Sequence, residues 1–284
     1  MTLATARDLH KSYGATAALD GFDLDVPEGA IVGLIGPNGS GKTTALRALT
    51  GLLGVDRGEL RVLDQDPWRS RAQLMRETAY IADVGTLPRW MRVRDLLDFV
   101  AGVHPGFDPA AARATLSRTE VREHARVGEL SKGMTAQLHL ALVMATAARL
   151  LVLDEPTLGL DLLYRRRFYE VLLSDYFEEG RAILLSTHEI SEIEHLLTHV
   201  VFIARGRTVL QASVEELAER FISVTAPQSE EAALKELGPL SLRRTLHGLE
   251  AVFDGIDPAR LPPQAQVRPS DLSGLFVAVL GGTA

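Results

Sequence analysis

The chain has 284 residues, of which 46% are hydrophobic, and it carries a formal net charge of −7 with no cysteine. This composition describes a globular protein with room for one large and one small domain, and the lack of cysteine excludes disulfides and thiolate metal sites. The acidic balance argues against a broad nucleic-acid-binding surface, and the sequence has neither an apolar run of about 18 residues nor a signal-peptide core, so we expect a cytoplasmic protein.

The first predicted element with a chemical signature is a glycine-rich loop between a strand and a helix. Residues 30–35 form a short apolar run typical of a strand buried on both faces, and residues 45–49 continue as a helix. Between them the pattern G-x-x-x-x-G-K-[ST] is matched by Gly36, Pro37, Asn38, Gly39, Ser40, Gly41, Lys42, Thr43 and Thr44. Backbone N–H groups and the helix N-terminus hold phosphates in such a loop, with Lys42 reaching the β- and γ-phosphates and Thr43 holding Mg²⁺. The loop therefore predicts a nucleotide ligand.

Three further apolar runs indicate a parallel sheet. They cover residues 150–153, 182–186 and 200–204 and alternate with helix-like stretches, which is typical of strands covered by helices. The long segment of about 84–148 is polar and helical in character. We interpret it as an inserted helical lobe.

Polar residues end two of these strands. Asp154 and Glu155 follow the run at 150–153, and His188 follows the next run. Because ligands of an open parallel sheet lie beyond the carboxyl ends of its strands, these side chains should lie beside the phosphate loop. Asp154 suits the Mg²⁺ shell, Glu155 suits activation of the attacking water, and His188 can bond the γ-phosphate. A lone histidine at such a place would more often be structural.

The pattern changes after a capping box at residues 213–216, which starts a helix. Residues 226–229 are typical of a linker. Short segments of alternating polar and apolar residues and a last helix follow. We therefore expect two domains, 1–220 and 221–284, the second a small α+β extension.

Taken together, these elements resemble the ATP-binding subunit of an ABC transporter, over residues 3 to about 220. That family is distinguished by a signature loop before a helix, and its place is occupied by Leu130-Ser131-Lys132-Gly133-Met134. Lys132 and Met134 stand where glycine and glutamine are common, whereas Ser131 and Gly133 are retained.

The resemblance implies a P-loop NTPase core of class α/β with an N-terminal antiparallel β part. It also implies a second ATP-binding subunit, identical or related, paired head to tail. Ser131 and Gly133 would then meet the γ-phosphate of the opposite subunit's ATP, Asp161 would lie in the loop that crosses between subunits, and Tyr13 would stack on adenine. An aromatic residue so near a chain start is more often packed in the core.

One departure from the family pattern is Asp83, which stands where glutamine is usual. A carboxylate accepts but cannot donate, and it can ligate Mg²⁺ directly or through water. It can equally be a solvated loop residue. The following Leu87, Trp90 and Met91 fall on the surface that the family uses to dock a membrane partner, although such residues also serve as lobe core.

We expect a subunit that binds ATP with Mg²⁺, hydrolyses it to ADP and phosphate, and powers a separate integral-membrane permease. The resemblance is closest to exporter-type systems and implies a peripheral location on the inner face of the cell membrane, with no nucleic-acid partner. Two alternatives remain: a soluble ABC ATPase in a non-transport process, and a weakly hydrolysing nucleotide switch. The single phosphate loop and the lack of a long coiled-coil insert argue against the first, and Asp83 motivates the second.

Overall fold

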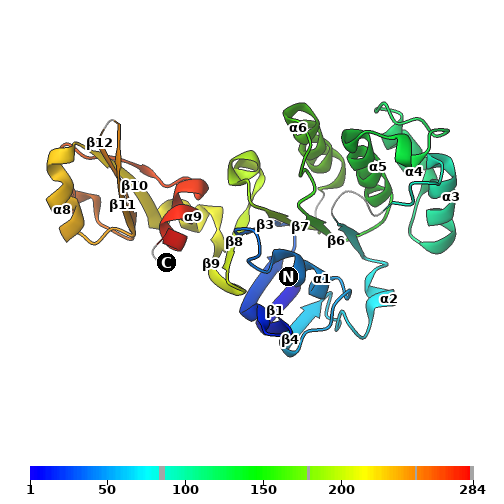
Figure 1. Ribbon diagram of the computed structural model, residues 1–284, viewed down its shortest axis with the longest axis horizontal. Helices are drawn as coiled ribbons and strands as arrows, with labels where there is room; N and C mark the ends of the chain where they lie inside the picture. Colours follow the sequence, from blue (N-terminus) through cyan, green and yellow to red (C-terminus); the bar gives the residue numbers. More distant parts are fainter. Residues whose placement is uncertain (83–86, 178–179, 247, 282–284) are drawn as a thin grey trace.

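The computed structural model describes residues 1–82, 87–177, 180–246 and 248–281. The molecule is elongated, with a helical lobe at one end, a separate small sheet at the other, and the sheets that carry the phosphate loop between them (Figure 1). The predicted metal ligand Asp83 lies outside the described residues. Within them, no helix has the length and apolar character needed to cross a membrane.

The N-terminal part is an antiparallel sheet in the order β2-β1-β4. Its strands are β1 (Thr2–Tyr13), β2 (Thr16–Pro27) and β4 (Arg57–Val62). Apolar side chains such as Leu9, Phe22 and Leu24 point inward, because alternate residues of a strand face the same side of the sheet. They share a core with Leu46 and Leu49 of α1 (Lys42–Leu49). The predicted antiparallel N-terminal part is confirmed.

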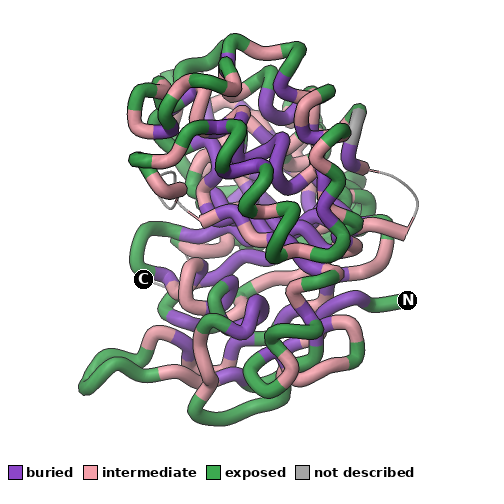
Figure 2. The backbone as a smooth tube through the Cα atoms, turned by 90° about the vertical axis from the view of Figure 1, so that its right-hand side faces the viewer, coloured by how far each residue is buried: buried purple, intermediate pink, exposed green. Residues whose placement is uncertain are grey.

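The central sheet has six strands in the order β5-β6-β7-β3-β8-β9, parallel except for the last. These strands are β3 (Ile31–Ile35), β5 (Thr78–Ile81), β6 (Leu150–Asp154), β7 (Ala182–Thr187), β8 (His199–Ala204) and β9 (Arg207–Ser213). The apolar runs form its interior strands, and β3, β6 and β7 are buried along their whole length because the sheet is covered on both faces. Figure 2 shows buried segments running through the inside of the molecule, with exposed residues mostly on its outside. The predicted α/β fold with a parallel core is confirmed.

The inserted segment is helical and has its own apolar core. Its helices are α3 (Val93–Val103), α4 (Pro109–Leu116) and α5 (Lys132–Met144), with a 3₁₀ turn at Val127–Glu129. Leu87 and Met91 pack against this core, whereas 75% of the Trp90 surface is exposed. Leu87 and Met91 therefore belong with the core of the lobe, and of the three residues only Trp90 lies at the surface.

Two helices lie outside the lobe between β4 and β7. The short α2 (Arg71–Leu74) precedes β5, and α6 (Leu162–Val171) runs on into a wider turn at Leu172–Tyr176 before β7. Two 3₁₀ turns, Ile190–Glu192 and Glu194–Leu196, connect β7 to β8.

The C-terminal part begins at α7 (Val214–Arg220), whose capping box at residues 213–216 forms as predicted. A second antiparallel sheet follows in the order β11-β12-β10-β13. Its elements are β10 (Phe221–Ala226), α8 (Glu231–Glu236), β11 (Ser241–Thr245), β12 (Gly248–Asp254), β13 (Gln266–Pro269) and α9 (Leu272–Gly281), with 3₁₀ turns at Gln228–Glu230 and Pro258–Arg260. The predicted linker at 226–229 is wrong, because Ala226 belongs to β10 and a 3₁₀ turn leads directly into α8.

The two faces of this sheet are covered differently. Val224, Leu249 and Phe253 pack with Leu234 of α8 in a separate apolar core. On the other side α9 lies between the sheet and the central sheet (Figure 1), and its Phe276 ring meets Phe202 of β8 edge to face at 5.2 Å. The C-terminal part therefore shares one of its faces with the main core.

Candidate functional site

The phosphate loop joins β3 to α1 and requires glycine for two different reasons. A Cβ on Gly36 would lie 2.3 Å from the Ile203 carbonyl oxygen, so no side chain fits there. Gly39 and Gly41 have φ angles of 77° and 110°, which L-residues adopt only with strain. Among the residues that the structure describes, no side chain caps the N-terminus of α1, so its first N–H groups remain available to an anion.

Lys42 points its ammonium group back into this loop. The side chain is 6% exposed, and Nζ donates to the carbonyl oxygens of Gly36 at 2.8 Å and Pro37 at 3.3 Å. Nζ also lies 3.2 Å from Glu155 Oε1. A buried ammonium needs such partners, and here they are two carbonyl oxygens of the loop and one carboxylate.

Asp154 and Glu155 are held by Ser186 on the neighbouring strand. Asp154 pairs with Ser186 in the β6–β7 register, and Ser186 Oγ donates to Asp154 Oδ1 at 2.7 Å while accepting the Glu155 N–H at 3.0 Å. One buried hydroxyl therefore orients both acidic residues.

Tyr80 on β5 holds the other oxygen of Asp154, donating from its hydroxyl to Oδ2 at 3.4 Å. Burial and the negative charge of Asp154 raise the pKa of Tyr80 to about 12, so the phenol stays protonated and can donate. The sequence reasoning assigned no role to Tyr80 or Ser186. The only sequence signal for them is a polar residue on a buried strand next to the strand that carries the carboxylates.

Glu155 is also bonded to His188. His188 Nδ1 lies 2.6 Å from Glu155 Oε2, while Oε1 of the same carboxylate faces Lys42. Glu155 has a φ of 48°, a left-handed conformation that costs about 1–3 kcal/mol in a non-glycine residue and is typical of functional sites. The three predicted catalytic residues thus form one contiguous group at the carboxyl ends of β3, β6 and β7.

The donors near this group fit a magnesium nucleotide. Thr43 supplies a hydroxyl in the first turn of α1, and Asp154 supplies a carboxylate, both oxygen ligands of the kind that Mg²⁺ prefers. The described residues contain no cluster of three or more His, Cys, Asp or Glu side chains, and Mg²⁺ is ordinarily held by one or two carboxylates together with substrate phosphates. In the loop itself, Ser40 Oγ is buried without a hydrogen-bond partner among the described residues. A phosphate oxygen would satisfy it.

Three further predicted site residues, Ser131, Gly133 and Asp161, lie around the starts of α5 and α6. Ser131 caps α5, accepting from the Met134 N–H at 3.2 Å, and Asp161 caps α6, accepting from the Tyr164 N–H at 3.0 Å. Gly133 packs so closely on Tyr164 that a Cβ would lie 2.8 Å from the ring. Ser131 and Asp161 are both exposed, and neither belongs to the hydrogen-bonded group of Lys42, Glu155 and His188.

Tyr13 ends β1 with 51% of its surface exposed. The ring is therefore outside the core, where an aromatic residue near the chain start would more often lie. Its predicted stacking on adenine stays a prediction.

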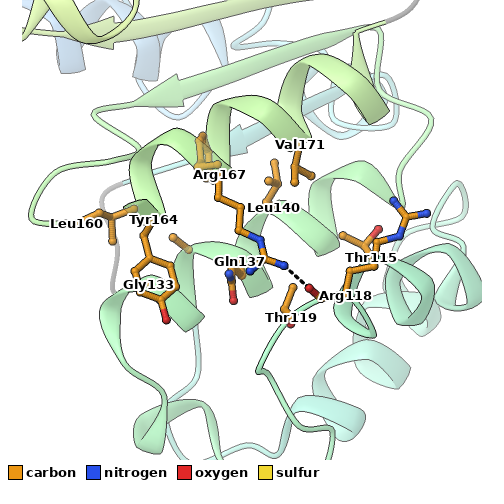
Figure 3. A pocket seen from close by; sticks show the side chains of 12 residues that line it. Thr115, Arg118, Thr119, Gly133, Gln137, Leu140, Leu160, Tyr164, Arg167 and Val171 are labelled. Atoms are coloured by element: carbon orange, nitrogen blue, oxygen red, sulfur yellow. Dashed lines mark hydrogen bonds between the residues drawn. The ribbon is translucent and has the colours of Figure 1, made fainter. Parts of the chain in front are cut away.

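A pocket separates α6 from α4 and α5 close to Gly133 (Figure 3). Gly133, Leu160 and Tyr164 line one side, and Arg167 reaches across to donate to the Arg118 carbonyl oxygen. The cavity measures about 40 Å³, whereas sites for small-molecule ligands usually measure about 300–1,000 Å³. It is therefore a narrow gap between the lobe and α6, too small for a nucleotide.

Comparison with known proteins gives concordant matches. The family described as ABC transporter matches residues 19–158. The Nod factor export ATP-binding protein I of Paraburkholderia xenovorans (strain LB400) is 34% identical over 297 residues, covering 95% of this chain and 94% of the relative. The ABC transporter ATP-binding protein YtrB of Bacillus subtilis (strain 168) is 28% identical, covering 77% of this chain and 74% of the relative.

Among solved structures, one described as the ATP binding subunit of an ABC transporter has a TM-score of 0.68 and 26% identity, covering 76% of this chain and 92% of that one. A dimeric ATP-binding cassette bound to ADP and Pi in a post-hydrolysis state has a TM-score of 0.65 and 18% identity, covering 74% of this chain and 98% of that one. At that lower identity the likeness concerns the fold alone.

Proposed function

Because the chain belongs to the family of ABC transporter ATP-binding subunits, we propose that it hydrolyses Mg²⁺-bound ATP to ADP and phosphate and thereby drives a separate membrane permease. The observation that carries this proposal is the contiguous group of Lys42, Glu155 and His188 beside the phosphate loop. A nucleotide-binding switch would need the loop and the lysine, but it would not need a carboxylate held between a lysine and a histidine.

The contacts support a proposed role for each residue. Lys42 exchanges the carbonyl oxygens of Gly36 and Pro37 for the β- and γ-phosphates, and Glu155, released from Lys42, accepts a hydrogen bond from the attacking water. His188 holds the second oxygen of Glu155 and so fixes the direction in which that carboxylate faces. Thr43 and Asp154 would hold Mg²⁺, which would supply positive charge to offset the charge developing on the phosphates.

The proposed partners follow from the family. We expect an integral-membrane permease. The similarity to Nod factor export ATP-binding proteins favours an exporter, with this subunit located peripherally on the inner face of the cell membrane. A second ATP-binding subunit would bring its Ser131 and Gly133 to this subunit's ATP. The loop at Asp161 is suited to such a contact, since the adjacent Leu162 and Leu163 are 75% and 80% exposed. Residues 1–220 would form the ATP-binding domain and residues 221–284 the extension.

Replacement of Glu155 by glutamine tests the proposal. Glu155→Gln keeps the size of the side chain and removes the charge that orients water, so we expect ATP binding to persist while turnover falls by about 10²-fold or more. An ATP-bound dimer should accumulate, detectable by size-exclusion chromatography. Glu170→Gln is the matched control, because Glu170 is exposed on α6 and pairs only with Arg166 among the contacts described. Wild-type turnover in Glu155→Gln would contradict the assignment of Glu155.

A further inference from the structure

Arg165 on α6 makes contacts that have no role in the reaction proposed above. Its Nε donates to the Leu160 carbonyl oxygen at 2.8 Å, directly before Asp161. Its Nη1 donates to the carboxylates of Glu189 and Glu192, which follow His188 in the chain. One guanidinium therefore spans the loop at Asp161 and the loop that carries His188.

These contacts continue to the group at the phosphate loop. His188 Nε2 lies 3.8 Å from Glu189 Oε1, and His188 Nδ1 lies 2.6 Å from Glu155 Oε2. The path from the Leu160 carbonyl through Arg165, Glu189 and His188 to Glu155 thus consists of neighbouring polar contacts. All five residues except Leu160 line one small cavity, so the path lies within a single site.

The ion pairs of Arg165 are partly shielded from water. The Arg165 side chain is 20% exposed and that of Glu192 is 23% exposed, so this pair is screened less than an ordinary surface ion pair, whereas Glu189 is 41% exposed and its pair with Arg165 is screened more. The hydrogen bond from Glu192 and the charge of Arg165 lower the pKa of Glu189, whereas burial and the neighbouring Glu189 raise the pKa of Glu192. The charged form is therefore favoured at Glu189, whose carboxylate lies 3.8 Å from His188 Nε2.

We propose that Arg165 is a positioning residue that couples the loop at Asp161 to the Glu155–His188 pair. A displacement of the Leu160 carbonyl moves the guanidinium, and Glu189 carries that movement to His188 and so to the carboxylate that orients the attacking water. Contact between subunits at Asp161 is thereby reported to the hydrolytic group of the same chain. This inference rests on the proposed ATPase function.

Arginine is required for this coupling because its donors point in fixed, divergent directions. Nε serves the carbonyl while Nη1 serves the carboxylates, and a lysine ammonium at this position cannot hold both sides at once. The adjacent Arg166 provides a matched comparison, since it is 79% exposed and pairs with Glu170 along its own helix.

The experiment measures ATP affinity and steady-state turnover for the full chain and for Arg165→Met, Arg165→Lys, Glu189→Gln and Arg166→Met. Arg165→Met and Arg165→Lys should both lower kcat at least about tenfold while the ATP dissociation constant changes by less than about twofold, because only the alignment of Glu155 is disturbed. Glu189→Gln should also lower kcat, and Arg166→Met should match wild type. In the double variant of Arg165→Met and Glu189→Gln, kcat should fall no further than in the worse single variant, because both act on one path.

Three results would overturn the coupling in a chain whose wild type hydrolyses ATP: wild-type kcat in Arg165→Lys, wild-type kcat in Glu189→Gln, or losses that multiply in the double variant. If Arg165→Met does not fold, Glu189→Gln decides alone, because it leaves the bond from Arg165 to Leu160 in place. Lack of hydrolysis by the wild type, with ATP bound, would instead contradict the proposed function.

Discussion

His139, in the helix α5 that follows the signature loop, makes the stability of the protein depend on pH. It lies within α5 and is only 7% exposed, and its Nε2 has no hydrogen-bond partner among the described residues. Burial lowers the pKa of His139 to about 4, because a charged imidazole cannot be solvated there. The folded protein therefore holds this histidine neutral under conditions where an unfolded chain protonates it.

The direction of the effect follows from the two pKa values. The ordinary pKa of a histidine is 6.5, so between that pH and about pH 4 the unfolded chain binds a proton that the folded chain does not. The folded state is consequently destabilised as the pH falls through this range. Above the range His139 causes no such destabilisation. From these pKa values, we expect His139 to lower the free energy of unfolding by about 2 kcal/mol when the pH falls from about 7.5 to about 5.

Urea unfolding of the full chain at these two pH values, followed by circular dichroism, measures the effect. His139→Leu removes the titrating group and its unpaired nitrogen, so the variant should lose about 2 kcal/mol less stability than wild type when the solution is acidified. His124→Leu serves as the control, because His124 is an exposed histidine of the same lobe. The reasoning is refuted if wild type and His139→Leu lose the same free energy between the two conditions.

Two further predictions concern the phosphate loop and the strand ends. Gly36→Ala forces a Cβ against the Ile203 carbonyl oxygen and should weaken nucleotide binding by about tenfold or more. At Gly39 an added Cβ would meet no described atom within 4 Å, so Gly39→Ala should retain binding and cost only about 1 kcal/mol of stability. Fluorescent-nucleotide titration distinguishes them, and equal affinities would show that the loop tolerates displacement at Gly36. Ser186→Ala removes the hydroxyl shared by Asp154 and Glu155, so we expect about 1–3 kcal/mol of destabilisation in urea and a lower kcat. Unchanged kcat would mean that the carboxylates are oriented without Ser186.

The sequence predicts the parts of the site that depend on local order along the chain. The phosphate loop follows β3 directly, Asp154 ends β6, and Glu155 and His188 follow β6 and β7. Knowing that the sheet is parallel is therefore enough to place them at one edge. Their roles in binding and hydrolysis stay predictions until the variants are measured.

What the sequence does not predict depends on pairing between distant segments. Ser186 meets Asp154 only through the register of β6 and β7, and Arg165 meets Glu189 only because α6 packs against the turn after β7. Hydrophobic patterning specifies which face of an element is buried, but it does not specify which polar residues meet across two elements. The linker expected at 226–229 was wrong for a related reason, since proline and serine there shape a turn inside a packed unit.

Helix α9 makes the C-terminal extension a poor candidate for a module that evolution can add or delete in one step. Its Leu275 and Phe276 pack with the core that contains β8, and its first N–H is held by Glu194 in the turn before β8 at 2.7 Å. A relative without the extension would expose the apolar surface around Phe202 unless other side chains replaced that cover. The length of the chain and the composition of β8 are therefore expected to vary together among relatives, with polar residues at the Phe202 position wherever α9 is missing.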